Sequence, residues 1–406
     1  MHRHPTRSAL LPAVMALALV LTACSKKTST STGSGSSNTP TAVPSLSATS
    51  FTPDMSAMAQ LKGLASQGKG NIGVLLPDTA SSARYTSFDQ PLLTQAFVKA
   101  GLTQAQFAVD NAQGSDSTQL SQAQALITGG ATVLLLDALD SGTGASIENY
   151  AKTQGVKVID YDRLVLNGQR GYYVSFDNVK VGGLIGSGEV SCVTAWNVKN
   201  PQVYELDGSP TDNNATLFAQ GYNAVLNPLY TNKTYTKVGE QAVTNWDNSV
   251  ALTDFQQAYT ANKNINAVVS ANDGLGNSVI TVLKNAHVPA KTVPVTGQDA
   301  TLGGLQNVLS GYQCGTVYKS ISVEAQAAAA LSLYVRAGQT APTALVNGTT
   351  KDTGANPNVD VPSVLLTPVW VTTQNMASTV IADNFVKKSD LCGGSYASLC
   401  SSAGIS

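Results

Sequence analysis

Short apolar runs alternate with longer stretches of helical periodicity along most of the chain. In the first half, these runs predict strands at residues 71–76, 105–109, 131–136, 156–161 and 171–175. Residues 131–136 (ATVLLL) are almost entirely apolar, as in a strand that is covered on both faces. Strands that alternate with helices in this way are typical of βαβ units, which build a parallel sheet.

The same pattern starts again after a helix predicted from residue 178 to about residue 193. The second half predicts strands at residues 203–206, 236–238, 267–270, 293–296 and 315–318. Gly182, Gly183 and Gly186 lie inside the predicted helix, which indicates close packing rather than a phosphate-binding loop. The sequence therefore predicts an α/β fold with two doubly wound parallel-sheet lobes. Because ligands bind beyond the carboxyl ends of the strands in such sheets, we expect the functional site between the lobes.

The N-terminus has the features of an export signal that ends in a lipid-modified cysteine. A short basic segment precedes an apolar run at residues 10–21, which is too short to span a bilayer. The run ends in the sequence LTAC, which resembles a bacterial lipobox with Cys24 as the acylated residue. We expect a signal peptide at residues 1–23 and a location on the extracytoplasmic face of the cell membrane. An ordinary signal peptide with an incidental cysteine is the alternative.

The segment that follows Cys24 is rich in Ser, Thr, Gly and Pro up to residue 50. Such a composition cannot bury enough apolar surface to fold. We therefore expect residues 24–60 to be the lipid anchor and a flexible tether, which holds the folded lobes away from the membrane surface.

Charge and motif content narrow the possible functions. The formal net charge is −1 and only 12% of the residues are charged, so a nucleic-acid partner is not expected. Of the three histidines, only His287 would remain after processing, which argues against a His-based catalytic triad. The sequence contains no HExxH, no GxSxG and no metal-spaced Cys/His set, so we expect neither a cofactor nor a metal.

Four cysteines remain if Cys24 carries lipid: Cys192, Cys314, Cys392 and Cys400. An even number in an oxidising compartment indicates disulfides, and four cysteines allow three pairings. We favour Cys392–Cys400 as a small terminal loop and Cys192–Cys314 as a long-range link. Free buried thiols are the alternative.

Polar side chains follow most of the predicted strands. In chain order they are residues 78–85 (DTASSARY), Asp162 and Arg163, residues 208–215 (GSPTDNNA), residues 241–248 (QAVTNWDN), Asn272 and Asp273, Gln298 and Asp299, and Lys319. This mixture suits a sugar, because carboxylates accept from hydroxyls, Arg and Lys donate to oxygens, and Asn does both. Tyr85 and Trp246 add aromatic faces on which the C–H groups of a sugar ring could pack.

Each of these residues also has an interpretation without a ligand. The alternatives are a surface ion pair for Asp162 and Arg163, helix capping for Asp212 to Asn214 and for Asn272 and Asp273, a solvated Lys319, and a core position for Trp246. Capping and binding are compatible, because one residue can cap while its neighbour binds. Their joint occurrence at the strand ends is what favours a binding site.

The segments that carry these residues resemble the xylose-binding and multiple-sugar-binding proteins of ABC importers, within the type I periplasmic-binding superfamily. The matching segments are SSARY, VIDYDRL, YYVSFDN, GSPTDNNATLF, NWD, SANDG, VTGQDA, GTVYK and VPSVLLTPVWVTTQNM, between residue 71 and about residue 392. The resemblance implies a monomeric receptor without enzymatic activity. It would close its lobes on a monosaccharide, xylose or a related aldopyranose, and deliver it to an ABC permease with its ATPase subunit.

The resemblance also assigns residues and lobes. The sugar contacts would be Arg84, Tyr85, Asp162, Arg163, Asp212, Asn214, Trp246, Asn272, Asp299 and Lys319. The N-terminal lobe would comprise residues 61–176 and 319–364, and the C-terminal lobe residues 177–318 and 365–406. The chain would cross between them at residues 173–178, near residue 318 and near residue 365. Tyr85 stands where the family usually has Trp, which keeps an aromatic face but changes the pocket. Asp137 is another polar strand-end residue and a further candidate contact, but the resemblance does not assign its role.

Two other functions remain open at this point. One is a sugar-sensing receptor for a signalling partner, which would use the same closed lobes. The other is a secreted glycoside hydrolase with paired carboxylates drawn from Asp162, Asp212 and Asp299. An Arg and a Lys among these carboxylates would keep them ionised, which suits binding better than general-acid catalysis.

Overall fold

The computed structural model describes residues 43–82, 84–355 and 357–405. The predicted signal peptide, Cys24 and the first part of the predicted tether lie outside the described residues. Among the described residues, no helix is long and apolar enough to cross a membrane.

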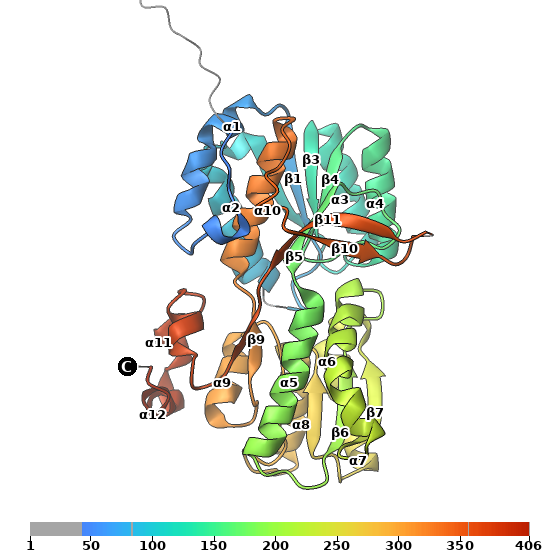
Figure 1. Ribbon diagram of the computed structural model, residues 1–406, viewed down its shortest axis with the longest axis vertical. Coiled ribbons are helices and arrows are strands. Elements are labelled where there is room, and N and C mark those ends of the chain that lie inside the picture. Colours follow the sequence, from blue (N-terminus) through green and yellow to red (C-terminus); the bar gives the residue numbers. More distant parts are fainter. Residues whose placement is uncertain (1–42, 83, 356, 406) are drawn as a thin grey trace, which may run out of the picture. The chain divides into compact units, whose positions relative to one another are not determined.

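The N-terminal lobe is built on a seven-stranded sheet in the order β10-β11-β5-β4-β3-β1-β2 (Figure 1). Its strands are β1 (Asn71–Leu76), β2 (Phe107–Asn111), β3 (Ala131–Leu136), β4 (Lys157–Tyr161), β5 (Tyr172–Phe176), β10 (Gly348–Asp352) and β11 (Val359–Leu366). All neighbours are parallel except the pair β10–β11.

Helices cover both faces of this sheet, as the apolar strands predicted. They are α1 (Lys62–Gln67), α2 (Gln90–Lys99), α3 (Asp116–Thr128), α4 (Ser141–Thr153) and α10 (Ile321–Arg336). In β3, Val133 and Leu135 pack in the same core as α2 and α10. Leu134 and Leu136 pack in a second core with α3 and α4. Alternate side chains point to opposite faces of a strand, so a strand buried on both faces has to be apolar at every position.

The C-terminal lobe has a parallel sheet in the order β7-β6-β8 and a short antiparallel pair, β12-β9. The strands are β6 (Gln202–Asp207), β7 (Thr236–Ala242), β8 (Ala267–Ser270), β9 (Thr316–Tyr318) and β12 (Val369–Val371). The helices are α5 (Asn178–Ala195), α6 (Asn213–Thr231), α7 (Asn248–Ala261), α8 (Asp273–Asn285) and α9 (Leu302–Ser310).

The prediction of a regular strand at residues 293–296 is wrong. Only Val295 forms a bridge there, to Val268 of β8. Pro294 has no N–H to donate, which limits regular pairing at this place.

Two glycines of α5 allow α6 to approach closely, as the sequence predicted. A Cβ at Gly182 would collide with the backbone of Phe218 in α6, and one at Gly186 would press on the backbone of Tyr222. A Cβ at Gly183 would face open space, so this glycine is not needed for the close approach.

The chain passes between the lobes three times. The crossings are from β5 into α5, from β9 into α10, and from β11 into β12 (Figure 1).

The prediction of a flexible tether as far as residue 60 is wrong for its last part. Leu46, Phe51 and Met58 are buried against the N-terminal core. The hydroxyl of Tyr334 in α10 also donates to the carbonyl of Pro44. The scattered apolar residues of this segment cover one side of α10, so the fold begins well before residue 60.

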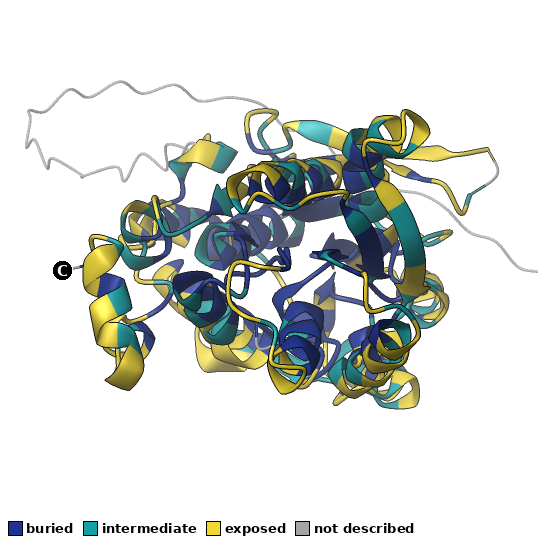
Figure 2. Ribbon diagram, turned by 90° about the horizontal axis from the view of Figure 1, so that it is seen from below, coloured by how far each residue is buried: buried dark blue, intermediate teal, exposed yellow. Residues whose placement is uncertain are grey.

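After β12 the chain ends in a small helical tail, residues 372–405. It contains η6 (Ala377–Ile381), α11 (Lys388–Leu391), η7 (Gly394–Tyr396) and α12 (Ala397–Ser402). Its apolar side chains pack with α9, and the tail lies at the outer side of the C-terminal lobe (Figures 1 and 2). Both favoured disulfides are present, Cys192–Cys314 between α5 and the start of β9 and Cys392–Cys400 within the tail.

Candidate functional site

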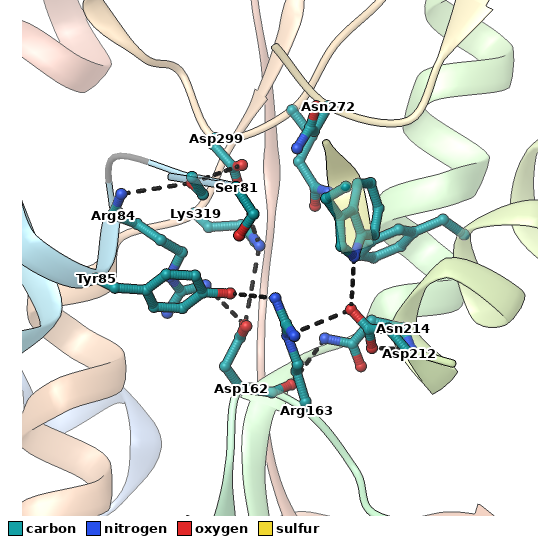
Figure 3. A pocket seen from close by; sticks show the side chains of 14 residues that line it. Ser81, Arg84, Tyr85, Asp162, Arg163, Asp212, Asn214, Asn272, Asp299 and Lys319 are labelled. Atoms are coloured by element: carbon teal, nitrogen blue, oxygen red, sulfur yellow. Dashed lines mark hydrogen bonds and ion pairs between the residues drawn. The ribbon is translucent and has the colours of Figure 1, made fainter. Parts of the chain in front are cut away.

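A small polar cavity lies where the carboxyl ends of the strands of both lobes meet (Figure 3). Its lining comprises Ser81, Ser82, Arg84, Tyr85, Asp162, Arg163, Asp212, Asn214, Phe218, Trp246, Asn272, Gln298, Asp299 and Lys319. All ten residues predicted as sugar contacts are in this set.

The N-terminal lobe presents its residues on two loops. Arg84 directly precedes η3 (Tyr85–Asp89), and Tyr85 is its first residue. This element is a π-helix of one turn, a kind of turn that often marks functional sites. Asp162 directly follows β4 with a φ of 58°, a left-handed conformation that Asp tolerates better than most residues. The hydroxyls of Tyr173 and Ser175 donate to the Asp162 carbonyl at 2.8 Å each, which fixes this bend.

The C-terminal lobe presents residues that also cap helices. Asp212 caps α6 by accepting from the N–H of Asn214, and Asn272 caps α8 by accepting from the N–H of Leu275. The capping interpretation is therefore correct, and both side chains also line the cavity. The other Asp212 oxygen accepts from the indole N–H of Trp246 at 3.0 Å.

Arg84 is enclosed by three carboxyl groups. Its guanidinium donates to Asp89 through two nitrogens, at 3.0 and 2.7 Å, to Asp162 at 2.6 Å and to Glu324 of α10 at 2.7 Å. All four side chains are buried. One guanidinium cannot neutralise three buried carboxylates, so the carboxyl groups around Arg84 differ in pKa.

Glu324 and Asp162 shift in opposite directions. Burial, together with the nearby Asp162 and Asp89, raises the pKa of Glu324 to about 8 in spite of Arg84. Burial also disfavours the ionised form of Asp162, but Arg84 and Lys319 outweigh it and lower the pKa of Asp162. Asp162 is therefore a carboxylate acceptor at neutral pH, whereas Glu324 is protonated.

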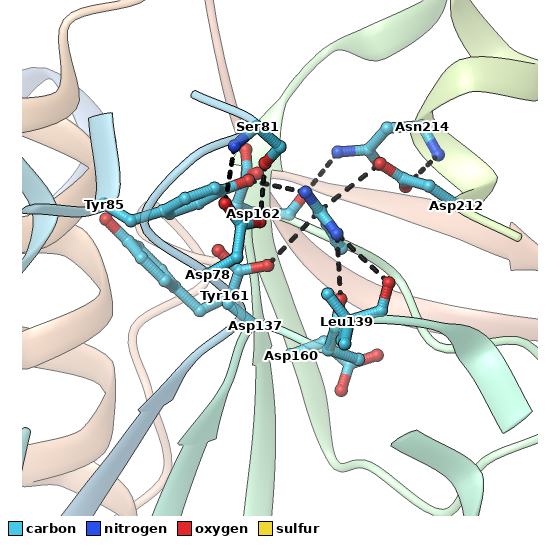
Figure 4. A network of polar contacts seen from close by, with 12 residues as sticks. Asp78, Ser81, Tyr85, Asp137, Leu139, Asp160, Tyr161, Asp162, Asp212 and Asn214 are labelled. Atoms are coloured by element: carbon cyan, nitrogen blue, oxygen red, sulfur yellow. Dashed lines mark hydrogen bonds and ion pairs between the residues drawn. The ribbon is translucent and has the colours of Figure 1, made fainter. Parts of the chain in front are cut away.

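Arg163 connects the two lobes (Figure 3). Its polar surroundings include Tyr85, Asp137, Leu139 and Asp212, which are labelled in Figure 4. On its own lobe it donates to the Tyr85 hydroxyl at 2.8 Å and to the carbonyls of Ala138 and Leu139 at 3.2 Å. It forms an ion pair with Asp212 of the other lobe at 3.3 Å. Asp137 lies 3.5 Å behind it, outside the cavity lining, and burial raises the pKa of Asp137 well above its ordinary value. Asp137 is thus a neighbour of Arg163 rather than a cavity residue.

Lys319, at the second crossing, joins the remaining carboxylates. Its ammonium lies 3.1 Å from Asp299 and 3.9 Å from Asp162. Burial lowers the pKa of Lys319, but the two carboxylates outweigh it and raise that pKa, so Lys319 is charged. The Asp299 oxygen nearest to Lys319 makes no hydrogen bond with any described residue. It is an available acceptor in the cavity wall.

Aromatic rings lie on both sides of the cavity. Tyr85 comes from the N-terminal lobe, and Trp246 and Phe218 come from the C-terminal lobe, with the last two in edge-to-face contact at 6.4 Å. Phe218 was missed by the sequence reading, because it lies inside α6 rather than in a strand-end loop. The signal was its position one helical turn after Asn214, on the same face.

Comparisons with known proteins agree on one family. Residues 72–340 match the model of the periplasmic binding protein domain. The D-xylose-binding periplasmic protein of Escherichia coli K12 is 37% identical over 71% of this chain and 83% of its own length. The multiple sugar-binding periplasmic protein SbpA of Azospirillum brasilense is 34% identical over 79% of this chain and 90% of its own.

Solved structures give the same answer. An ABC transporter solute-binding protein from Clostridium phytofermentans with bound β-D-glucose superposes with a TM-score of 0.70 at 25% identity, over 79% of this chain and 99% of its own. A carbohydrate transporter solute-binding protein from Chloroflexus aurantiacus in complex with D-glucose has a TM-score of 0.69 at 26% identity, over 79% and 97%. These relatives are receptors, so the chain is a binding protein and the glycoside hydrolase alternative is abandoned. By its sequence, its fold and the place of its cavity, the chain belongs to the type I periplasmic binding proteins.

Proposed function

We propose that this protein is the receptor of an ABC importer for a monosaccharide, xylose or a related aldopyranose. The observation that carries the proposal is the cavity wall. It combines charged acceptors, charged donors, amides and three aromatic rings around one small cavity. The relatives whose names include D-xylose, multiple sugars and D-glucose support the same ligand class.

The wall offers the kinds of donor and acceptor that sugar hydroxyls need. Asp162 and Asp299 accept hydroxyl protons, and Arg163 and Lys319 donate to oxygens. The amide N–H groups of Asn214 and Asn272 add donors, because their amide oxygens already accept hydrogen bonds within the protein. Charge-assisted bonds are stronger than neutral ones, so a few such contacts orient a small polar ligand. The rings of Tyr85 and Trp246 would pack on its C–H faces.

Binding would proceed by closure of the hinge. Because the wall residues come from both lobes, a ligand completes its contacts only when the lobes meet, which favours the closed form. The closed receptor would then dock on a membrane permease, and a separate ATPase subunit would supply the energy. We propose that the receptor is a monomer and that lipid on Cys24 keeps it near the permease.

Calorimetric titration of the full-length chain with D-xylose, D-glucose and D-galactose tests the proposal. The protein is first unfolded, dialysed and refolded, to remove any sugar that copurifies with it. We expect at least one aldose to bind with a Kd in the micromolar range or tighter, on the order of −8 kcal/mol. Mannitol, an acyclic polyol, is the control and should bind far more weakly. The absence of binding heat for every aldose would contradict the proposal.

A further inference from the structure

Two phenylalanine rings stack at the boundary between the N-terminal lobe and the tail. The centroids of Phe88 and Phe385 are 4.2 Å apart, and their planes are inclined by only 9°. Both side chains are half-buried. The two residues come from opposite ends of the chain, so no local sequence constraint brings them together.

Phe385 is fixed to the C-terminal lobe. Its ring also meets Tyr318 edge to face at 4.9 Å. The Tyr318 hydroxyl donates to Asp383 at 2.9 Å, and Asn384 adopts a left-handed φ of 54° that turns the chain between them. The Phe385 side chain packs with the cluster formed by α9 and the tail. Phe385 should therefore move with the C-terminal lobe when the hinge opens.

Phe88 is fixed to the N-terminal lobe and to the cavity. It lies in η3, the turn that begins with Tyr85 and ends with Asp89. Tyr85 lines the cavity, and Asp89 holds the guanidinium of Arg84, which also lines it. Any contact that holds Phe88 therefore also restrains the two cavity residues on its turn.

We propose that the tail is an interlobe latch and that Phe385 is a positioning residue for the binding site. Phe385 acts through Phe88 on the turn that carries Tyr85 and follows Arg84. The latch contact is made in the closed form, so it favours that form both with and without sugar. This inference rests on the proposed sugar-binding function for its effect on affinity, but not for the contact itself.

The latch makes a quantitative prediction for affinity. Contacts made only in the closed form raise the apparent affinity of every ligand that binds that form. For a stacked aromatic pair, loss of the latch should weaken sugar binding by about 2- to 12-fold. Asp162 and Asp299 would still be in place, so binding should weaken and not disappear.

The test uses Phe385→Ala, Phe88→Ala, their double variant and Phe385→Tyr in the full-length chain. Tyr396→Ala is the matched control, because it removes a half-buried ring of the tail that packs in the same cluster as Phe385. The first measurement is hydrogen–deuterium exchange of residues 84–90 without added sugar. The second is the Kd for the aldose that the unmodified protein binds best, with thermal unfolding as a check on folding.

We expect faster exchange at residues 84–90 and a 2- to 12-fold higher Kd in either single alanine variant. The double variant should bind sugar no more weakly than either single variant. Phe385→Tyr and Tyr396→Ala should both have the exchange rate and the Kd of the unmodified protein. Unchanged exchange in both alanine variants, or strictly additive losses of affinity, would overturn the latch. If the unmodified protein bound no aldose, the proposed function would fail, whereas the exchange experiment would still decide whether the latch contact restrains η3.

Discussion

Single side chains in the cavity wall compete for a small number of partners. Arg84 forms ion pairs with Asp89, Asp162 and Glu324. Lys319 forms ion pairs with Asp162 and Asp299. Buried ionised groups are costly unless they are paired, so this sharing determines which carboxyls stay charged. The side chains of the wall hold one another in place through these ion pairs. The loss of one charge should therefore change the pKa values of the neighbouring groups.

Asp299→Asn should weaken sugar binding by about 10- to 100-fold, because it removes a charged acceptor worth about 1.5–3 kcal/mol. The fold should be retained, since Asn has nearly the same shape. Calorimetry with the best aldose measures the effect. Asp360→Asn is the control, because Asp360 makes an exposed ion pair with Lys351. Equal affinities of the two variants would contradict the role of Asp299.

Glu324→Gln should change how stability depends on pH. The folded pKa of about 8 lies above the ordinary value of 4.5, so the contribution of Glu324 is fully present below about pH 4.5 and is lost as the pH rises to about 8. In this window the unmodified protein should lose up to about 1.4 kcal/mol per pH unit more than the Gln variant, which cannot ionise. Urea unfolding at pH 5, 6, 7 and 8 measures the difference. Parallel stability curves would mean that Glu324 is not protonated in the folded state.

At the scale of elements, the contact between α5 and α6 links packing to the site. Phe218 lies in α6, lines the cavity, and contributes the backbone that would meet a side chain at Gly182. The close approach of the two helices therefore sets how far Phe218 reaches into the cavity.

Gly182→Ala and Gly183→Ala are a matched pair that tests this contact. The Gly182 variant should lose about 1–3 kcal/mol of stability, because the methyl group has to displace the backbone of α6. The Gly183 variant should gain about 0.5–1 kcal/mol, because Ala favours helix and the space is open. Urea unfolding midpoints give both values. A similar change in the two variants would show that the glycines are interchangeable.

Element positions also explain what the sequence could predict. The alternating pattern placed the strands, and in parallel sheets the strand ends meet at one edge, so the loops that follow the strands were predicted to lie together. The family resemblance then selected the ten candidate residues within these loops. Phe218 was missed because it reaches the cavity from within a helix. The packed segment from residue 46 was missed because its few apolar residues are spread through a polar composition. Asp89 and Glu324 were missed because only the folded structure brings them to Arg84.

On the scale of the whole molecule, the two disulfides close loops of very different length. Cys192 and Cys314 are separated by 122 residues, whereas Cys392 and Cys400 are separated by 8. The stabilisation expected from restricting the unfolded chain grows with this separation, to about 5 kcal/mol for the long loop and about 2.5 kcal/mol for the short one.

The double variant Cys192→Ala/Cys314→Ala should therefore lose more stability than Cys392→Ala/Cys400→Ala. Neither pair lines the cavity, so the Kd for the sugar should be nearly unchanged in both. Unfolding in urea, with the sugar Kd measured beside it, checks the two statements. A larger loss from the short-loop pair would mean that local packing of the tail outweighs loop length.

The three crossings also have a consequence for how the protein is made. The sheet of the N-terminal lobe needs β11 beside β5, and its core needs α10, but both are synthesised after nearly all of the C-terminal lobe. A growing chain that has passed β9 already holds the whole sheet β7-β6-β8, whereas β5 still lacks one neighbour. We therefore expect the sheet of the C-terminal lobe to form first. The sheet of the N-terminal lobe should keep an unpaired edge at β5 until β11 has been synthesised. Termination before residue 359 would leave neither lobe complete, because the N-terminal lobe would still lack β11 and the C-terminal lobe would still lack β12 and the tail.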